Sequence, residues 1–248
     1  PLGQSQVLPY IIGLKQKGYN VTIISFEKPK QTNREKIKSI LSENLIEWIP
    51  LSYTKKPPIL STIWDIVKLN KTVKSLNHQS IDLIHCRSYI TSIVALKIKI
   101  KYNIPFIFDM RGFYADERVD GKIWNKSNFI FRNVYQYFKR KEKEFLIQSN
   151  YTVSLTNTGK KEIESWKLNG QSPIEVIPCC TDEDLFHKEN IKPVRKEFGL
   201  KENDFVLSYV GSIGTWYMLD EMLDFFKELK KKKENAKFLF ITKDDPKS

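Results

Sequence analysis

The residues best suited to chemistry lie in a short stretch, FDMRGFYADERVDG, at positions 108–121. Within twelve residues it holds six charged side chains of both signs: Asp109, Arg111, Asp116, Glu117, Arg118 and Asp120. Carboxylates can bind hydroxyl groups or act as a general base, and arginine can hold a carboxylate or a phosphate. The alternative is a salt-bridge network that pins the loop. Because exposed ion pairs contribute only about 0–1 kcal/mol each, stability alone explains this density poorly.

A second charged stretch, IHCRSY at 84–89, also follows an apolar run. His85 can act in acid–base chemistry or as a hydrogen-bonding group, and Arg87 can hold an anion. The alternative is a half-buried histidine with a structural hydrogen bond. Asp109 and Arg111 are separated by one residue, so an extended chain would place them on the same face. Open α/β sheets bind ligands beyond the carboxyl ends of their strands, so we expect chemistry in these loops.

Two glycine-containing loops could contact a phosphate. PLGQSQ at 1–6 precedes a helix, and YVGSIGTWYMLDE at 209–221 joins a strand to a helix. Backbone N–H groups at a helix start can hold a phosphate, and Ser212 or Thr215 can donate to it. The second loop is not G-x-G-x-x-G, which disfavours a dinucleotide site, although Asp244 resembles the ribose-binding acid of such sites. The alternatives are an ordinary capped loop and a glycine-rich connection.

The chain alternates short β-rich runs with helix-length segments. Strands are expected at 21–26, 45–51, 81–86, 104–108, 151–156, 174–178, 205–211 and 237–242. Helices are expected at 5–18, 59–77, 89–102, 125–149 and 218–234. Several strands are almost continuously apolar, which indicates burial on both faces. This alternation predicts an α/β fold with a mainly parallel sheet flanked by helices.

The polar, proline-containing stretch 191–204 predicts a linker between two domains. Residues 1–190 would form the first domain. Residues 205–248 would supply the first β-α-β unit of a second, truncated domain. The sequence starts at Pro1, in what looks like a loop, and ends just after a strand-like run. We therefore interpret it as a fragment of a longer protein.

The composition narrows the classes of partner. Lysine plus arginine outnumber aspartate plus glutamate by 41 to 29, giving a net charge of +12. This balance suits anionic partners such as nucleotides, phospholipid headgroups, nucleic acid or phosphorylated substrates. The three cysteines, Cys86, Cys179 and Cys180, argue against a disulfide scaffold and against a zinc site. No apolar run approaches the roughly 18 residues of a membrane span. No signature of an RNA- or DNA-binding module supports nucleic acid as the partner.

In their order along the chain, these motifs resemble a bacterial glycosyltransferase of family 4. The resemblance rests on PLGQSQVLPYIIGLKQKGYNVTIISFE, IDLIHCRS, VIPCCTDEDLF and YVGSIGTWYMLDEMLDFF. DMRGFYADERVDG resembles a subgroup that makes surface polysaccharides. The match runs along nearly the whole chain and implies a GT-B architecture of two facing Rossmann-like domains. The family's first strand would then precede Pro1, and its donor-binding glutamates would follow Ser248.

The resemblance implies transfer of a sugar from a nucleotide-sugar donor to a glycan or lipid-linked acceptor, in cell-surface polysaccharide synthesis. It also implies retention of anomeric configuration, no metal or other cofactor, and a cytoplasmic protein that is peripheral on the inner membrane face. This fragment would be inactive alone. The alternative is a non-catalytic GT-B-like module that binds or scaffolds a partner.

The resemblance also implies roles for individual residues. The catalytic residues would be Asp109, Arg111 and His85, and the acceptor-binding residues Arg87, Asp116, Glu117 and Arg118. The donor-binding residues would be Gly3, Gln4, Gly211, Ser212, Gly214 and Thr215. The chain departs from the family at several of these positions. Arg87 replaces a second histidine, Asp109-Met110-Arg111 stands where many members have a histidine, and Ser212 replaces an arginine.

The segment 125–149 predicts a helix that mixes aromatic and basic residues. At 100° per residue, one broad face would hold Ile130, Val134, Phe138 and Phe145, flanked by cations. A core-packed helix with a solvated basic side is one interpretation. The other is a docking surface for anionic lipid, since related transferases often take lipid-linked acceptors.

Overall fold

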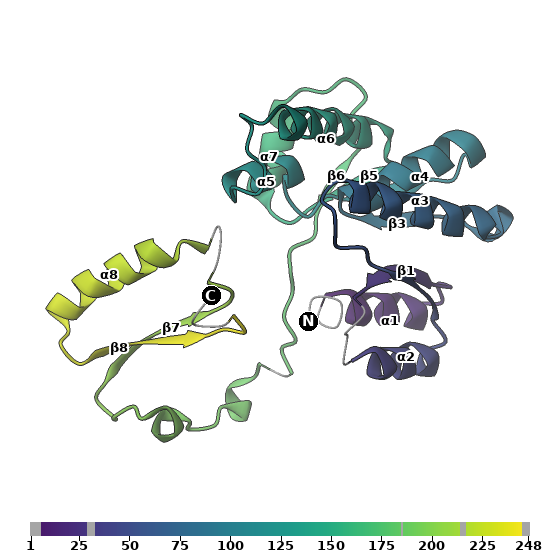
Figure 1. Ribbon diagram of the computed structural model, residues 1–248. Helices are drawn as coiled ribbons and strands as arrows, with labels where there is room; N and C mark the ends of the chain where they lie inside the picture. Colours follow the sequence, from purple (N-terminus) through teal and green to yellow (C-terminus); the bar gives the residue numbers. More distant parts are fainter. Residues whose placement is uncertain (1–5, 29–32, 185, 214–216, 245–248) are drawn as a thin grey trace. The chain divides into compact units, whose positions relative to one another are not determined.

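The computed structural model describes residues 6–28, 33–184, 186–213 and 217–244 (Figure 1). The chain forms two compact units. The first comprises residues 1–115 and 133–181, and the second comprises residues 116–132 and 182–248. The predicted linker at 191–204 stays a prediction.

The first unit contains two parallel sheets. In one, β1 (Thr22–Glu27) pairs with β2 (Glu47–Ser52). The other has the order β3 (Ile84–Arg87), β4 (Phe106–Asp109), β5 (Tyr151–Ser154) and β6 (Ile174–Val176). The helices that begin in this part of the chain are α1 (Leu8–Gln16), α2 (Arg34–Glu43), α3 (Leu60–Ser75), α4 (Tyr89–Tyr102), α5 (Tyr114–Asp120) and α7 (Asn157–Ser165). The long helix α6 (Phe129–Gln148) begins in the second unit and runs into the first.

Helices cover both faces of the β1–β2 sheet. Ile23 packs against the cluster that contains Leu8 of α1, whereas its neighbour Ile24 packs against the cluster that contains Leu69 of α3. Since successive strand residues point to opposite faces, α1 and α2 lie on one face and α3 on the other (Figure 1). Ile84 of β3 also packs against the α3 cluster, so this layer of helices covers both sheets.

An aromatic cluster joins α4, β4 and α6. Tyr89, Phe108 and Phe145 are fully buried, and the ring of Phe108 lies 5.2 Å from each of the other two rings. Both contacts are edge-on, the geometry that aromatic quadrupoles favour. Tyr114 stacks on Tyr89 at 5.4 Å. The cluster fixes the start of α4 against β4, whose last residue is Asp109.

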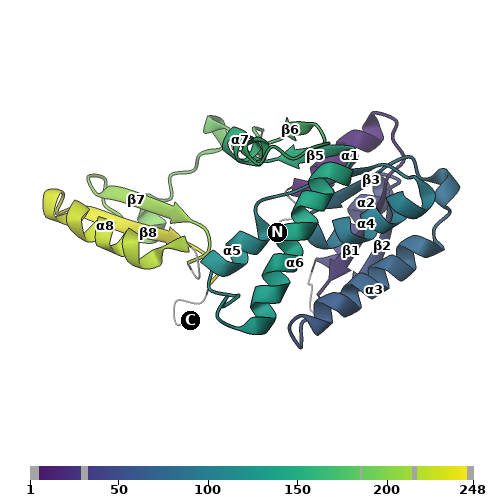
Figure 2. The same ribbon diagram turned by 90° about the horizontal axis from the view of Figure 1, so that it is seen from above.

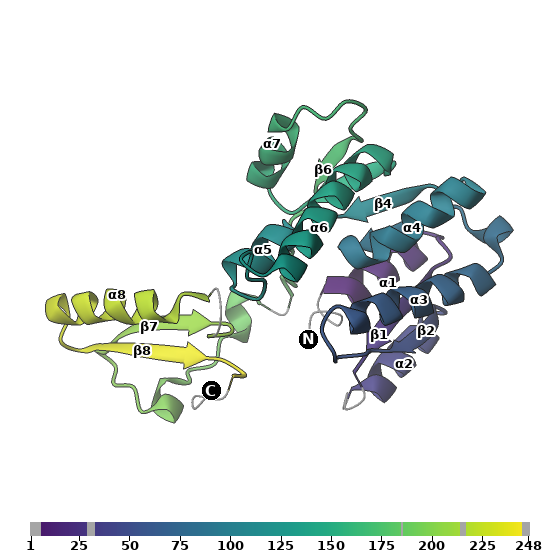
Figure 3. The same cartoon turned by 45° about the horizontal axis from the view of Figure 1, so that its top comes forward.

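The second unit contains the β-α-β unit that the sequence predicts. β7 (Phe205–Val210) pairs in parallel with β8 (Ala236–Ile241), and α8 (Leu219–Lys232) lies along them (Figures 2 and 3). Phe226 of α8 packs on Phe238 of β8 with ring centroids 5.0 Å apart. Among the described residues, no helix combines the length and the apolar character needed to cross a membrane.

Within the described residues the predicted strands and helices are present, and the α-helices α2, α5 and α7 are found in addition. Asp116, Glu117 and Arg118 lie in α5, so the predicted loop is wrong there. Acidic residues in the first turn and Arg118 in the last agree with the helix dipole, and Ala115 is fully buried. α7 buries a single apolar residue, Ile163, which gives no apolar stripe to detect. α2 does carry a short apolar face, because Ile37 and Ile40 pack in the same cluster as Leu41, and the sequence prediction missed it.

Candidate active site

The charged residues singled out by the sequence meet at the carboxyl ends of two neighbouring strands. β3 and β4 are parallel, and their register pairs Arg87 with Asp109. Both residues end their strands, so the loops that follow leave the sheet at the same edge. In open α/β sheets this edge is where ligands bind.

The Asp109 carboxylate lies at the centre of this group. Its side chain is only 8% exposed. His85 Nε2 lies 3.5 Å from Oδ2, and Arg87 Nη1 lies 4.0 Å from the same oxygen. Arg111 Nη1 lies 3.9 Å from Oδ1, which is buried and has no hydrogen-bond partner among the described residues. A buried acceptor of this kind lacks a partner from the protein, and a substrate hydroxyl can reach it once the side chains that cover it move aside.

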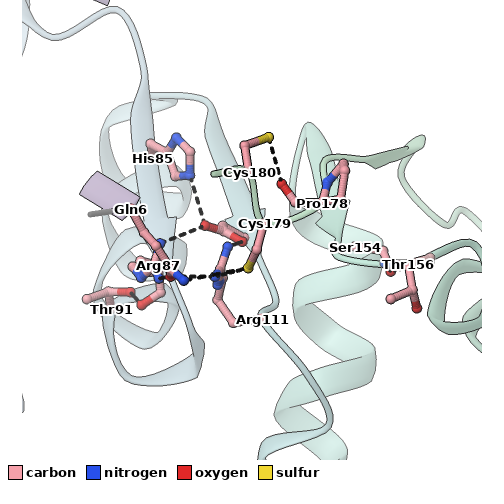
Figure 4. A network of polar contacts seen from close by, with 11 residues as sticks. Gln6, His85, Arg87, Thr91, Arg111, Ser154, Thr156, Pro178, Cys179 and Cys180 are labelled. Carbon is pink, nitrogen blue, oxygen red and sulfur yellow. Dashed lines mark hydrogen bonds and ion pairs between the residues drawn. The ribbon is translucent and has the colours of Figure 1, made fainter. Parts of the chain in front are cut away.

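Two guanidinium groups converge beside this carboxylate. Gln6 Oε1 accepts hydrogen bonds from Arg87 Nη2 at 2.7 Å and from Arg111 Nη2 at 3.0 Å (Figure 4). Arg111 Nη2 also lies 3.3 Å from Cys179 Sγ, and Gln6 Nε2 lies 3.7 Å from the same sulfur. The two cations therefore share neutral or weakly polar partners and one loosely held carboxylate. Arginine binds a well-placed carboxylate or phosphate more strongly than it binds an amide oxygen or a thiol. The two side chains, named here the arginine pair (Arg87 and Arg111), therefore suit an anion.

The electrostatics of Arg87 agree with this interpretation. Burial lowers the pKa of Arg87, and the charge of Arg111 lowers that pKa further. Asp109 and Cys179 act in the opposite direction but do not offset the first two causes. Arginine stays protonated in proteins, so the lowered pKa reports repulsion and poor solvation of a cation that is present. An anion between the two guanidinium groups relieves both.

The backbone beside the arginine pair is strained. Ser88, with φ 72° and ψ −179°, and Arg111, with φ 62°, are non-glycine residues at positive φ. Such conformations cost about 1–3 kcal/mol each and persist only where surrounding contacts hold them. Ser88 N donates to the Asp109 carbonyl at 2.7 Å, and Thr91 Oγ1 donates to the Ser88 carbonyl at 3.0 Å. These hydrogen bonds hold the strained backbone of the loop after β3 beside the end of β4.

A buried polar group holds the Arg111 loop from behind. The Tyr89 hydroxyl lies 2.5 Å from Glu142 Oε1 and 3.2 Å from the Gly112 carbonyl oxygen. Glu142 is fully buried on α6 and forms an ion pair with Lys139. Lys139 also lies over the Trp166 ring, 4.9 Å from its centroid. The loop after β4 is therefore tied to both α4 and α6.

This arrangement predicts a measurable role for one hydroxyl group. Tyr89→Phe removes the group between Glu142 and the Gly112 carbonyl, and weakening a buried polar network costs about 1–3 kcal/mol. We expect the unfolding free energy of the full-length protein to fall by that amount in urea. Tyr19→Phe, at a tyrosine that is 61% exposed, is the control and should change nothing. Equal stabilities of the two variants would contradict the role assigned to Tyr89.

The sequence profile described as Glycosyltransferase Family 4 matches residues 6–185, which is well over half of the chain. The chain belongs to glycosyltransferase family 4. No curated protein sequence matches it significantly. The matched region contains Gln6, the arginine pair, Asp109 and Cys179, so the whole candidate site lies in the family 4 part of the chain.

Solved structures of low sequence identity share the fold of this family 4 chain. Sucrose-phosphate synthase from Thermosynechococcus elongatus has a TM-score of 0.67 at 14% identity, over 97% of this chain and 57% of that one. Arabidopsis thaliana UGT89C1 complexed with UDP-L-rhamnose has a TM-score of 0.53 at 15% identity, over 97% and 66%. UDP-GlcNAc 2-epimerase from Neisseria meningitidis bound to UDP-GlcNAc has a TM-score of 0.52 at 15% identity, over 95% and 62%. These likenesses establish a GT-B type fold, and the family 4 chain spans 57–66% of these three proteins.

The other predicted site residues of the family 4 chain lie elsewhere. Asp116, Glu117 and Arg118 lie on α5 and belong to the second compact unit, so their acceptor role stays a prediction. Gly3, Gln4, Gly214 and Thr215 lie outside the described residues. Gly211 and Ser212 follow β7, and a Cβ at Gly211 would come within 2.9 Å of the Tyr209 hydroxyl oxygen. Asp244 Oδ2 accepts a hydrogen bond from Ile213 N at 2.8 Å, so this acid supports the glycine loop.

Gln6 and Cys179 are the site residues that the sequence does not predict. Both lie in segments that carry the family resemblance, but neither is a charged residue at a strand end. The three cysteines also differ in character. Burial raises the pKa of the Cys86 thiol to about 12, which keeps that thiol neutral, whereas Cys179 and Cys180 are exposed.

Proposed function

We propose that this chain is the acceptor-side part of a glycosyltransferase that uses a nucleotide-sugar donor. The acceptor, a glycan or a lipid-linked sugar in cell-surface polysaccharide synthesis, would carry a phosphate or carboxylate near the hydroxyl that receives the sugar. One observation carries the proposal: within the family 4 region, Arg87 and Arg111 donate to the same Gln6 oxygen, beside the buried Asp109. Transfer with retention of configuration belongs to the same proposal.

The chemistry follows from these positions. Arg87 and Arg111 give up their hydrogen bonds to Gln6 and bind the acceptor anion through their two guanidinium groups. Asp109 Oδ1 then accepts the hydrogen bond of the reacting hydroxyl and can take its proton as the hydroxyl oxygen bonds to the anomeric carbon and the bond from that carbon to the nucleoside diphosphate breaks. For retention, the hydroxyl would approach from the face that the diphosphate leaves. His85, 3.5 Å from Oδ2, holds the carboxylate in place. Binding of the leaving nucleoside diphosphate by the Gly211–Ser212 loop is a separate prediction, based on the backbone N–H groups that such a loop offers.

The proposal is tested with the full-length protein, because we expect residues 1–248 alone to show no turnover. A panel of uridine, guanosine and cytidine nucleotide sugars is titrated by calorimetry, and product formation is followed by chromatography with anionic and neutral sugar acceptors. We expect one nucleotide class to bind, and transfer to favour an acceptor that carries a phosphate or carboxylate. Equal transfer to neutral analogues would contradict the anionic acceptor, and the absence of nucleotide-sugar binding would contradict the donor.

Two other outcomes identify the rival functions. Nucleotide-sugar binding without turnover on any acceptor would favour a non-catalytic module that binds or scaffolds a partner. Salt-dependent binding to generic DNA or RNA, without nucleotide-sugar binding, would favour a nucleic-acid-binding protein. The net charge of +12 is the sole basis for that last alternative.

Contact of the 125–149 segment with anionic lipid, at the cytoplasmic membrane face, remains a proposal. Fewer residues of this segment could take part than the sequence suggests. Phe138 and Phe145 are buried, so they are not available to a membrane, whereas Ile130 is 59% exposed. Lys139 and Lys141 form ion pairs with glutamates of the same helix. The exposed cations Arg140 and Lys143 contribute to a shallow hollow of about 300 Å³, lined by Tyr135, Gln136, Lys139, Arg140 and Lys143.

A further inference from the structure

α3 carries an apolar stripe that does not pack against the described residues as a core face would. Leu60 is 63% exposed, Ile63 52%, Trp64 60% and Val67 52%. These four residues, named here the α3 stripe, follow the i, i+3, i+4, i+7 spacing of one helix face. The opposite face is buried and holds Ser61, Asp65, Leu69 and Val73. Since the buried face already anchors the helix, the stripe adds nothing to the core, and a continuous exposed apolar surface of this kind marks an interaction site.

The surface around the α3 stripe is basic. Lys71 and Lys74 continue the stripe along the same helix face and are exposed. Between Tyr53 and Ser80 the sequence holds five lysines and a single acid, Asp65. Asp65 is buried and pairs with Lys68 at 2.9 Å. The exposed charge next to the apolar residues is therefore positive.

Two further lysines precede the helix in a segment that is anchored at both ends. Thr54 N donates to Asp65 Oδ2 at 3.1 Å, and Lys68 Nζ donates to Thr54 Oγ1 at 2.8 Å. At the other end of this segment, Leu60 N donates to the Pro58 carbonyl at 2.8 Å. Lys55 and Lys56, both exposed, lie between these anchored residues. The segment before α3 thus adds two exposed cations to the chain just ahead of Leu60, the first residue of the stripe.

We propose that the α3 stripe and its flanking lysines dock on an anionic phospholipid surface. Apolar side chains and a tryptophan enter the boundary between headgroups and acyl chains, and lysines bind the anionic headgroups. A second copy of the chain fits less well, because the pairing would bring two lysine-rich surfaces together. The inference names the lipid-binding surface for the membrane-facing role in the proposed function, and its test does not depend on sugar transfer.

The test is sedimentation of the full-length protein with vesicles. Vesicles of phosphatidylcholine mixed with phosphatidylglycerol should bind the protein, and vesicles of phosphatidylcholine alone should not. Salt should weaken the binding. The double variants Ile63→Ser/Trp64→Ser and Lys71→Gln/Lys74→Gln should each lower the apparent affinity on the order of tenfold or more. Lys36→Gln/Lys38→Gln is the matched control, because it removes the same charge as the lysine variant from exposed positions of α2, on the other face of the β1–β2 sheet. Arg140→Gln/Lys143→Gln tests the rival surface on α6.

A second readout follows Trp64 directly. Its fluorescence should shift to the blue when anionic vesicles are added, and Trp64→Phe should bind as the wild type does without that part of the shift. The stripe variants alter exposed side chains, so circular dichroism should match the wild type. Binding that ignores lipid charge, or that is lost in the α6 variant and kept in both α3 variants, would overturn the proposal. If the stripe variants differed from the wild type in oligomeric mass but bound vesicles as the wild type does, the result would also overturn the proposal and assign the stripe to self-association.

Discussion

Replacing Asp109 with asparagine should lower kcat of the full-length enzyme at least about 100-fold, because general acid–base groups contribute on the order of 10²–10⁴-fold. The affinity for an anionic acceptor should be unchanged or higher. The effects on kcat and on affinity differ because Asp109 would interact with the acceptor in two ways. Its Oδ1 atom can receive the reacting hydroxyl, yet its negative charge competes with the acceptor anion for Arg87 and Arg111.

The control for Asp109→Asn is Asp65→Asn. Both carboxylates belong to residues that are 5% exposed, and each is paired with a cation in the same compact unit. Asp65 holds the segment before α3 and lies outside the site, so its variant should lose stability without a specific loss of kcat. Acceptor affinity is measured by calorimetry and kcat by initial rates. If Asp109→Asn weakened acceptor binding and kcat in proportion to its loss of stability, Asp109 would be a structural residue.

The rule that ligands bind at the carboxyl ends of parallel strands predicts the residues around Asp109, but it does not predict Gln6 and Cys179. Two charged pairs could be predicted: His85 with Arg87, and Asp109 with Arg111. An apolar run precedes each pair, and parallel strands end at a common edge of the sheet. Gln6 is 81 residues from Arg87, and 173 residues separate it from Cys179. No local pattern encodes such contacts, since they depend on how α1, β3 and the segment after β6 come together.

Helix α6 contains a buried charged residue that the spacing of apolar residues does not predict. The apolar spacing predicts a face with Phe138 and Phe145, and both are buried. The same face also buries Glu142, a residue that a hydrophobic pattern assigns to solvent. Its burial depends on the Tyr89 hydroxyl and on Lys139, one from another helix and one a single turn away. A buried charge of this kind can be predicted only when its partners are known.

Arg111→Lys should lower kcat/KM for an anionic acceptor at least about tenfold, which corresponds to about 1.4 kcal/mol of transition-state stabilisation. Lysine keeps the charge but loses the planar fork. Arg111 uses that fork: Nη2 reaches Gln6 and Cys179, and Nη1 lies on the Asp109 side. One ammonium group cannot occupy both positions, so the acceptor anion would lose one of its bonds.

The position of Arg111 makes this substitution a test of geometry rather than of folding. The side chain is 21% exposed, and the positive φ belongs to the backbone, so lysine inherits the same strain and the melting temperature should be nearly unchanged. Arg140→Lys, on the exposed face of α6, is the matched control and should leave kcat/KM and the melting temperature as they are. A parallel fall of melting temperature and activity in Arg111→Lys would support a structural salt-bridge network. An unchanged kcat/KM would show that charge alone suffices, and would remove bidentate binding from the mechanism.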